Sequence, residues 1–441
     1  MYTVGLYTLG CKVSQYETEA IAEEFLRLGF SVRPYEEKND LYVVNTCTVT
    51  AESDRKCRQI IRRAIKNNPD AFVMVTGCYS QRSPERIAKI PGVLCVIGTE
   101  NKMTLPKIAV EILKKRKNGT PCDVFVSVTD VSKASFEPMC IENAPRTRAY
   151  VKIEDGCESK CTYCAISAAR GRVRSKAPDD VIREVEGLAV KGTLEAVLTG
   201  IETASYGRDF DFKYDLSDLL SALDSRKSIS RIRLGSLAPE LITDAFVEKI
   251  KDLKILAPHF HLSVQSGSDA VLRSMKRRYN SRAAMHTIEK IRESINGATF
   301  TTDIMVGFPG ESEEDFEASL SFVRRARFLD AHVFAYSRRV GTEATDYPSQ
   351  IPESIKRERS ERMIREKNLV RDSVLDECIA LGAQLSAIAE TKREDGRYTG
   401  HTDTYIEVVF ESENDVRGRM VSLLPVSHKN GILHCNLIGI I

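Results

Sequence analysis

Several common features are missing from this sequence of 441 residues. No stretch approaches 18 consecutive apolar residues, so the sequence offers no candidate membrane-spanning helix. Its first residues, MYTVGLYTLGCKV, lack the basic start, the apolar segment and the small-residue cleavage site of a signal peptide. The formal net charge is only +2, so any contact with a polyanion must rest on local patches. Tryptophan is also absent, which excludes nothing.

Cysteine, by contrast, is plentiful, with twelve residues. A chain without a signal peptide is expected to be cytoplasmic, and disulfides are rare in the cytoplasm. Metal binding or catalysis therefore explains the cysteines better than disulfides do. We expect a cytoplasmic protein that makes no contact with membranes.

The chain is long enough for two or three domains, and its pattern indicates an α/β protein. Residues 1–112 alternate apolar strands with amphipathic helices, which predicts a small parallel α/β domain. Residues 113–142 lose this periodicity, so we expect a linker. Six strand candidates within residues 143–373 predict a partial (βα)6 barrel of the TIM type, with its chemistry at the C-terminal strand ends. Residues 375–441 change to period-two alternation, which predicts a small antiparallel β-barrel.

Three cysteines, Cys157, Cys161 and Cys164, form a C-x3-C-x2-C run after the first strand candidate of the middle region. Thiolates select soft metals, chiefly zinc and iron–sulfur clusters. A structural zinc site needs a fourth ligand, but the next cysteine is Cys378 and no histidine lies within ninety residues downstream. A four-iron cluster with three protein ligands would leave one iron free for a small molecule. Packing as small hydrophobic residues is the alternative, which the polar character of the loop disfavours.

A second set of cysteines, Cys11, Cys47 and Cys78, ends three strand candidates of the first domain. Parallel strands bring their C-terminal ends to one edge of a sheet, so these thiols are expected to meet there. The remaining six cysteines are interpreted as core residues.

The 157–164 run, with Tyr163 before its last cysteine, resembles the signature of radical S-adenosylmethionine enzymes. The segments around the second set, GCKVSQYETEA, NTCTVT and TGCYSQ, resemble the N-terminal domain of the methylthiotransferases of that superfamily. The resemblance extends over essentially the whole chain. It implies an N-terminal methylthiotransferase domain, a radical core and a C-terminal TRAM-like barrel.

This resemblance also implies the cofactors, namely two [4Fe–4S] clusters and S-adenosylmethionine. In the family, the open iron of the first cluster binds the methionine moiety, and one electron releases a 5′-deoxyadenosyl radical. The auxiliary cluster, on Cys11, Cys47 and Cys78, delivers sulfur, and a methylthio group bonds to the carbon that lost hydrogen. An electron donor such as flavodoxin or ferredoxin is implied as a partner.

Cofactor-binding residues follow from the same resemblance. Glu202 lies where the family holds the methionine amine, and Arg233 and Ser236 are candidates for contacts with the carboxylate or the ribose. The further candidates are Tyr163, Gln265 and Asp303, the last beside a glycine-rich turn expected near the adenine. Each of these candidates also has an ordinary interpretation. The glycine-rich segment can be only a turn, and Arg233 is also typical of a surface ion pair. No side chain is assigned a catalytic step of its own.

Two departures from the family pattern stand out. Ser14 occupies a position where the family more often has asparagine, and residues 165–167 replace bulkier aliphatic residues and a proline. The first bears on hydrogen bonding near the auxiliary cluster, and the second on packing near the radical cluster. Neither alters the predicted ligands.

The family divides by target, which is either adenosine 37 of tRNA, carrying an isopentenyl or a threonylcarbamoyl group, or an aspartate of ribosomal protein S12. The GCKV start, the QYE that follows and the LTGIE strand look most like the threonylcarbamoyladenosine branch. The expected partner is then the anticodon stem-loop with N6-threonylcarbamoyladenosine at position 37. The other two targets remain alternatives, as does an iron–sulfur or zinc protein that binds nucleic acid or carries electrons.

Local charge favours RNA only in places. Basic residues gather within 146–176 and 273–278, where we expect phosphate contacts. Residues 382–441 carry six Lys or Arg and eight Asp or Glu, a net charge of −2, so the barrel needs a local patch. The candidates there are Lys392, Arg393 and Arg397, with Tyr398 or Tyr405 stacking on unpaired bases.

Overall fold

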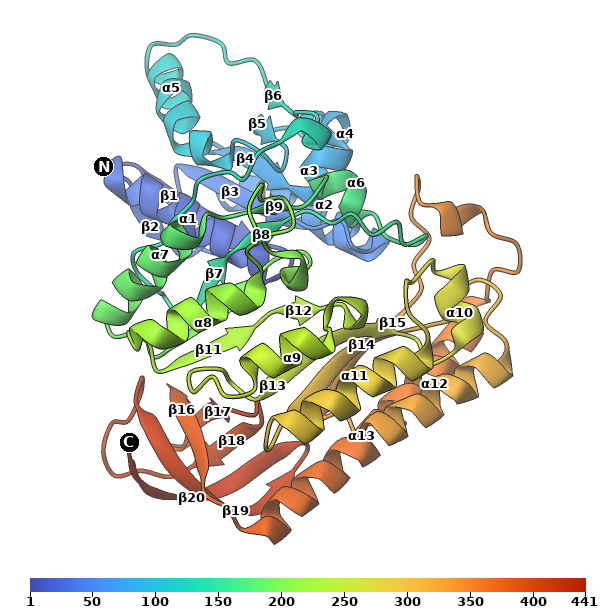
Figure 1. Ribbon diagram of the computed structural model, residues 1–441. Coiled ribbons are helices and arrows are strands. Elements are labelled where there is room, and N and C mark those ends of the chain that lie inside the picture. Colours follow the sequence, from blue (N-terminus) through green and yellow to red (C-terminus); the bar gives the residue numbers. More distant parts are fainter.

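The computed structural model describes all 441 residues as three units that follow one another along the chain. In Figure 1 the N-terminal sheet and its helices lie at the top, a parallel-stranded core in the middle and a closed barrel at the bottom. The predicted α/β class and three-part architecture are therefore confirmed. None of the helices combines the length and the apolar character that crossing a membrane requires.

Six parallel strands form the N-terminal sheet in the order β2-β1-β3-β4-β5-β6. Helices α1 and α5 pack on one face, and α2, α3 and α4 on the other. Because β3 and β4 lie between two helical layers, every one of their residues is buried. The strands are β1 (Thr3–Thr8), β2 (Ser31–Arg33), β3 (Leu41–Thr46), β4 (Phe72–Gly77), β5 (Val93–Ile97) and β6 (Phe125–Ser127). The helices are α1 (Lys12–Arg27), α2 (Ala51–Asn67), α3 (Cys78–Arg82), α4 (Pro84–Ala88) and α5 (Leu105–Lys117).

The segment predicted as a linker, residues 113–142, contributes to this first unit. It contains the end of α5 and the edge strand β6, which pairs in parallel with β5. The first sheet therefore continues to Ser127.

The core contains two parallel sheets, β11-β10-β7 and β12-β13-β14-β15. A single residue separates β11 from β12, so these two short strands together count as one strand that connects the two sheets. The core is then an open barrel of six strands. The strands are β7 (Arg148–Lys152), β10 (Glu195–Thr199), β11 (Arg231–Leu234), β12 (Ser236–Leu237), β13 (His259–Gln265), β14 (Thr299–Val306) and β15 (Asp330–Ala335). The outer helices are α7 (Pro178–Val190), α8 (Leu216–Arg226), α9 (Asp244–Ile250), α10 (Asp269–Ser274), α11 (Ser281–Ser294) and α12 (Glu313–Ala326). After β7 come a small ribbon, β8 (Glu154–Asp155) with β9 (Arg174–Ser175), and the short helix α6 (Ile166–Arg170).

The long helix α13 (Glu353–Leu381) runs along one side of the core to the C-terminal barrel (Figure 1). That barrel closes in the order β16-β17-β18-β20-β19. All its strand pairs are antiparallel except β18 with β20, which is parallel, so the predicted antiparallel barrel needs this one correction. The strands are β16 (Leu385–Lys392), β17 (Tyr398–Thr402), β18 (Glu407–Phe410), β19 (Met420–Lys429) and β20 (Ile432–Ile440).

Candidate active site

Glycine precedes two of the predicted metal-binding cysteines for a steric reason. Gly156, before Cys157, has a φ of +92°, and a Cβ there would lie 1.9 Å from a backbone oxygen. Gly77, before Cys78, has a φ of +99°, and a Cβ there would lie 2.5 Å from another backbone oxygen. Only glycine fits such positions without strain, so the backbone holds both cysteines in fixed places.

The second set of cysteines comes together at one edge of the N-terminal sheet. Cys11 directly precedes α1, Cys47 follows β3, and Cys78 begins α3 after β4. Strands β1, β3 and β4 are neighbours in the sheet, so their C-terminal ends lie side by side. Burial, together with the nearby Cys47 and Cys11 sulfurs, raises the pKa of the Cys78 thiol to about 11, although the charge of Arg170 opposes this shift.

Each of the six predicted ligands has a polar hydrogen-bond partner at its sulfur. Backbone N–H groups of Val49, Ser159 and Ile166 donate to Cys47, Cys157 and Cys164 at 3.4–3.5 Å. Guanidinium groups of Arg170 and Arg277 donate to Cys78 at 3.2 Å and to Cys161 at 3.3 Å. The hydroxyl of Ser14, at the departure from the family pattern, lies 3.8 Å from the Cys11 sulfur.

The other six cysteines have different surroundings. The thiols of Cys57, Cys122 and Cys140 donate to backbone carbonyls, and those of Cys95, Cys378 and Cys435 form no hydrogen bond. Donors that face a sulfur stabilise a thiolate and tune an iron–sulfur cluster bound to it. Hydrogen bonding thus separates the predicted ligands from the other cysteines. The core interpretation is confirmed for Cys57, Cys95 and Cys435, which are buried, whereas Cys122 and Cys378 are only partly buried; it is wrong for Cys140, which is exposed.

The donor set fits an iron–sulfur cluster better than a single metal ion. All twelve cysteines are free thiols. No group of three or more His, Cys, Asp or Glu side chains is placed to hold one metal ion. A cluster takes its thiolates on different irons and so accepts more widely spaced sulfurs. Burial raises the pKa of Cys157 to about 12, so this thiol stays protonated at neutral pH until a metal displaces the proton.

A cavity of about 260 Å³ lies between Cys164 and the segment that follows Cys47. Val49 and Thr50, which follow Cys47, form part of its wall, and Cys164 of the radical loop forms another part. Three of the predicted cofactor-binding residues also line it, namely Tyr163, Gln265 and Asp303. The ring of Tyr163 packs edge-on against Phe308, with ring centres 6.4 Å apart.

Two side chains in this cavity have the features of a ligand-binding wall. Gln265 ends β13 with a φ of +70°, and its buried Oε1 has no hydrogen-bond partner. Asp303 on β14 receives His261 Nε2 at 3.3 Å and lies 3.5 Å from His332 Nδ1. Although burial opposes ionisation, these two histidines hold the pKa of Asp303 below its usual value. An unpartnered amide oxygen beside free thiols suits a polar small molecule.

Glu202 lies near the radical loop, since its backbone N–H donates to the carboxylate of Glu154, three residues before Cys157, at 2.8 Å. Its Oε1 accepts the N–H of Ala238 at 3.0 Å, and burial raises its pKa to about 7. Ser236 lies on β12, partly buried, and lines none of the larger cavities. Arg233 pairs with Glu195 at 2.7 Å and donates to two carbonyls of the C-terminal barrel. The structure thus brings Glu202 to the cysteine loop, whereas the donors of Arg233 are used elsewhere.

Comparison with known proteins agrees with this geometry. Two family profiles match the chain, the Radical SAM superfamily over residues 151–323 and Uncharacterized protein family UPF0004 over residues 3–98. The Threonylcarbamoyladenosine tRNA methylthiotransferase MtaB of Bacillus subtilis is 39% identical over 430 residues, which cover 96% of this chain and 93% of that protein. The chain belongs to the radical S-adenosylmethionine methylthiotransferase family.

Two further relatives extend the comparison. A tRNA-2-methylthio-N(6)-dimethylallyladenosine synthase of Carboxydothermus hydrogenoformans is 32% identical, with 97% of this chain and 98% of that protein covered. The structure of the radical S-adenosylmethionine methyltransferase TsrM from Kitasatospora setae has a TM-score of 0.57 at 17% identity, covering 78% of this chain and 77% of that chain, which supports the fold. The methylthiotransferase is therefore a tRNA-modifying enzyme that uses a [4Fe–4S] cluster and S-adenosylmethionine.

A buried ion network joins the N-terminal unit of the methylthiotransferase to its core. The sequence alone did not predict it. Arg170, at the end of α6, is fully buried and donates to Glu17 at 2.6 and 3.2 Å and to Asp155 at 3.0 Å. Lys152 pairs with Glu17 at 3.0 Å and with Asp155 at 2.5 Å. Lys102 adds a third cation, 3.1 Å from Glu17. Because Glu17 lies on α1 and its partners include core residues, these contacts fix the two units together.

Several residues predicted to contact tRNA are therefore interior. The prediction is wrong for four basic residues that are buried, namely Lys152, Arg170, Arg174 and Lys176. The side chain of Arg277 is also mostly buried and faces Cys161, so it is not available to a phosphate. The exposed cations of the two predicted stretches are Arg146, Lys160, Arg172, Arg273, Lys276 and Arg278.

The two tyrosines proposed to stack on bases are also unavailable. Tyr398 is fully buried inside the C-terminal barrel. Tyr405 stacks on His259 and His401, with ring centres 4.5 and 5.0 Å apart, and two guanidinium groups approach its ring. Tyr405 therefore joins the barrel to the core instead of presenting a free face to RNA.

Proposed function

We propose that this methylthiotransferase converts N6-threonylcarbamoyladenosine at position 37 of tRNA to its 2-methylthio derivative. The sulfur is delivered through a second [4Fe–4S] cluster, held by Cys11, Cys47 and Cys78. The choice of substrate is supported by the MtaB relative, which at 39% identity is nearer than the 32% of the dimethylallyladenosine synthase. Its RNA partner is the anticodon stem-loop, whose target base must leave the stack to reach a closed pocket.

The observation that carries this proposal is the cavity beside Cys164. Its wall includes Val49 and Thr50, which follow Cys47, as well as Cys164 itself. A substrate in this space would lie against the radical loop and next to the segment of Cys47, and sulfur transfer to a carbon radical requires such proximity.

Each group of residues then has a separate task. When bound, the clusters and S-adenosylmethionine supply the radical and the sulfur. Cys157, Cys161 and Cys164 would hold one cluster, and Arg277 would fix the sulfur of Cys161 by its hydrogen bond. We assign Glu202 to the methionine amine of S-adenosylmethionine. Gln265 and Asp303, which line the cavity beside Cys164, are assigned to polar groups of the adenosyl part of this cofactor. The apolar wall, with Met305, Phe334 and Tyr336, excludes water.

A dimethylallyladenosine substrate is the second candidate, because relatives named for that activity match nearly the full chain.

Two further predictions are not tested by the structure. Arg233 and Ser236 remain predicted contacts of the cofactor, and a flavodoxin or a ferredoxin remains the predicted electron donor. Replacing dithionite by either reduced protein tests the donor.

The test uses full-length protein reconstituted anaerobically with iron and sulfide, and then supplied with dithionite and S-adenosylmethionine. Two tRNA substrates are compared, one with threonylcarbamoyladenosine and one with isopentenyladenosine at position 37. Mass spectrometry of the digested nucleosides measures gain of one methylthio group. Cys157→Ala and Cys11→Ala each remove a predicted ligand, and Cys95→Ala is the matched control because Cys95 is a buried thiol without a hydrogen bond.

We expect product from threonylcarbamoyladenosine, loss of product in both ligand variants, and retention in Cys95→Ala. Product only from isopentenyladenosine would transfer the assignment to the second candidate. Product that persists in Cys11→Ala would contradict sulfur delivery through the second set of cysteines.

A further inference from the structure

Lys12 is a partly buried cation without a partner. It is the first residue of α1 and directly follows Cys11. Its side chain is partly buried, and no side-chain hydrogen bond or ion pair engages its ammonium group. An ammonium removed from water without an anion is unfavourable, so this position is prepared for an anionic ligand.

The charged groups around Lys12 are already engaged with one another. Those whose charges act on it most strongly are Arg148, Arg233, Glu195 and Asp303. Arg233 pairs with Glu195 at 2.7 Å, and Arg148 pairs with Glu390 at 3.2 Å. Asp303 is held by His261 and His332. Lys12 is therefore the one cation of this group that has no carboxylate of its own.

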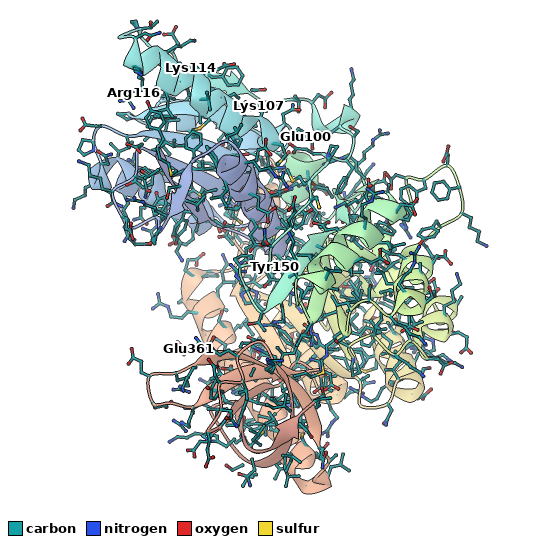
Figure 2. All side chains as sticks on the ribbon, turned by 90° about the vertical axis from the view of Figure 1, so that its left-hand side faces the viewer. Glu100, Lys107, Lys114, Arg116, Tyr150 and Glu361 are labelled. Carbon is teal, nitrogen blue, oxygen red and sulfur yellow. The ribbon has the colours of Figure 1, made fainter.

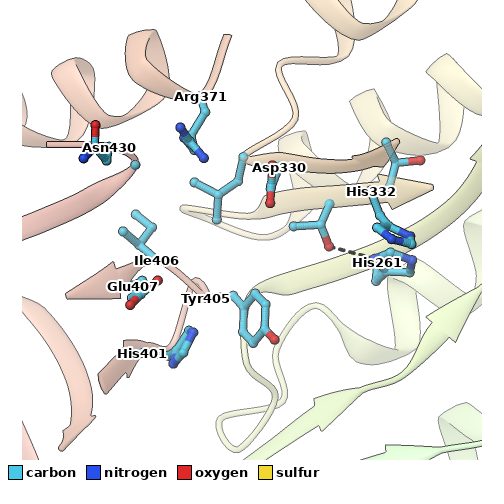
Figure 3. Close-up of a pocket in the computed structure, with 13 residues that line it drawn as sticks. His261, Asp330, His332, Arg371, His401, Tyr405, Ile406, Glu407 and Asn430 are labelled. Atoms are coloured by element: carbon cyan, nitrogen blue, oxygen red, sulfur yellow. Dashed lines mark hydrogen bonds between the residues drawn. The ribbon is translucent and has the colours of Figure 1, made fainter. Parts of the chain in front are cut away.

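Two cavities meet beside this group. The cavity at Cys164 has Asp303 and His332 in its wall. A second cavity of about 280 Å³, shown in Figure 3, lies between the core and the C-terminal barrel and also has His332 in its wall. His261, which binds Asp303, lines this second cavity, and Figure 3 shows the two histidines side by side. Asp303 lines the first cavity, and the guanidinium groups of Arg148 and Arg233 lie 5.5 and 5.0 Å from the ring of Tyr405, which lines the second. Lys12, on which all three charges act, therefore lies near the place where the two cavities share His332.

We propose that Lys12 binds the carboxylate of the threonylcarbamoyl group and so determines specificity for an anionic substituent at N6 of adenosine. This inference rests on the proposed function, because the dimethylallyl group is uncharged. The ammonium and the carboxylate form charge-assisted hydrogen bonds in a partly dehydrated site.

The position of Lys12 links recognition to sulfur delivery. Lys12 is the neighbour of Cys11 in the chain, and Cys11 is a predicted ligand of the sulfur-donating cluster. Fixing the substituent at Lys12 therefore holds the adenine at a constant place relative to that cluster. Precise placement of reacting atoms is worth large factors in rate, so loss of this contact affects turnover as well as binding.

The test measures binding of fluorescent anticodon stem-loops to reconstituted full-length protein by anaerobic anisotropy. Three RNAs are compared: one carries threonylcarbamoyladenosine, the second carries its methyl ester and the third carries unmodified adenosine at position 37. The variants are Lys12→Met, which removes the charge, and Lys12→Arg, which keeps it. Lys107→Met is the matched control, because Lys107 is exposed on α5, on the outer side of the N-terminal unit (Figure 2).

We expect the wild-type protein to bind the acid about ten- to a hundredfold more tightly than the ester, the usual value of a charge-assisted contact. Lys12→Met should lose this preference and bind the other two RNAs as before. Lys12→Arg should retain most of it, and Lys107→Met all of it. Iron content and S-adenosylmethionine affinity should not change in Lys12→Met.

Three results would overturn the inference. Equal wild-type affinity for acid and ester would show that no residue reads the carboxylate, and this measurement needs no variant. Equal losses for all three RNAs in Lys12→Met would assign Lys12 to a phosphate, and weaker S-adenosylmethionine binding would assign it to the cofactor. If wild-type protein fails to methylthiolate threonylcarbamoyladenosine at all, the proposed function itself fails.

Discussion

Glu202 is a buried carboxyl group whose charge changes close to neutral pH. Burial raises its pKa to about 7, although the N–H of Ala238 opposes this shift. The carboxyl is neutral below that pH and becomes an anion, and a stronger acceptor for the methionine amine, above it. We therefore expect the affinity for S-adenosylmethionine to rise between about pH 6 and pH 8, by at most about tenfold per unit.

The control for this prediction is Glu202→Gln, which keeps the size of the side chain but does not titrate. The amine of S-adenosylmethionine titrates in both proteins, so the difference between the two pH profiles isolates Glu202. Equilibrium dialysis under anaerobic conditions gives the affinities. Profiles of identical shape would assign the pH dependence to another group.

Some residues of the site could be predicted from the sequence alone, and others could not. The cysteine ligands are predictable because their spacing and strand-end positions are local features. The donors to their sulfurs are not, since Arg170 and Cys78 are 92 positions apart, and Arg277 and Cys161 are 116 apart. Their positive charge suggested phosphate contacts, and only the fold shows that both face thiols. Lys12 was visible in the sequence, but its lack of a partner was not.

The short helix α6 connects the two cysteine sets and gives a prediction at the scale of one element. It begins two residues after Cys164 and ends at Arg170, which donates to Cys78 and to the carboxylates of Glu17 and Asp155. Arg170→Met removes one of the two cations that those buried carboxylates share, and leaves Lys152 as the other. We expect the free energy of unfolding to fall by about 3 kcal/mol, the low end of the range for broken buried ion pairs, because Lys152 still compensates both carboxylates. Guanidinium chloride unfolding followed by circular dichroism measures the change.

Arg172→Met is the matched control, because Arg172 is exposed only two residues farther along the chain. A change there should stay within about 0.5 kcal/mol, as is usual for surface positions. Equal midpoints for the two variants would show that the α6 network contributes nothing to stability.

Elements were predictable where their hydrophobic pattern is strong and uncertain where it is weak. Strands β3 and β4 are buried throughout and stand out as apolar runs. Strand β6 has three residues at the edge of the sheet, and its first two are exposed, so no pattern distinguishes it from a linker. The parallel pairing of β18 with β20 depends on the path of the chain through β19, which periodicity does not encode.

The basic residues of the whole molecule do not form one general RNA-binding surface. Four basic residues near the radical loop are internal, and the net charge of the chain is only +2. Figure 2 shows a separate group of cations, including Lys114 and Arg116, on α5 at the end of the molecule away from the C-terminal barrel. Two surfaces therefore compete as the site of phosphate contacts, and salt dependence can distinguish them.

Lys160 and Arg278 are exposed beside the cysteine loop, and the Arg278 guanidinium donates to the carbonyl of Glu158 at 3.5 Å. Each phosphate contact contributes about 0.7–0.9 to the slope of log affinity against log salt concentration. The double variant Lys160→Ser, Arg278→Ser should therefore lower this slope for tRNA by about 1.5. The same change at the exposed residues Lys114 and Lys115 should leave the slope unaltered, because this part of α5 lies at the end of the molecule away from the C-terminal barrel (Figure 2). If only the α5 pair lowers the slope, tRNA approaches across the N-terminal unit and the radical loop makes no phosphate contact.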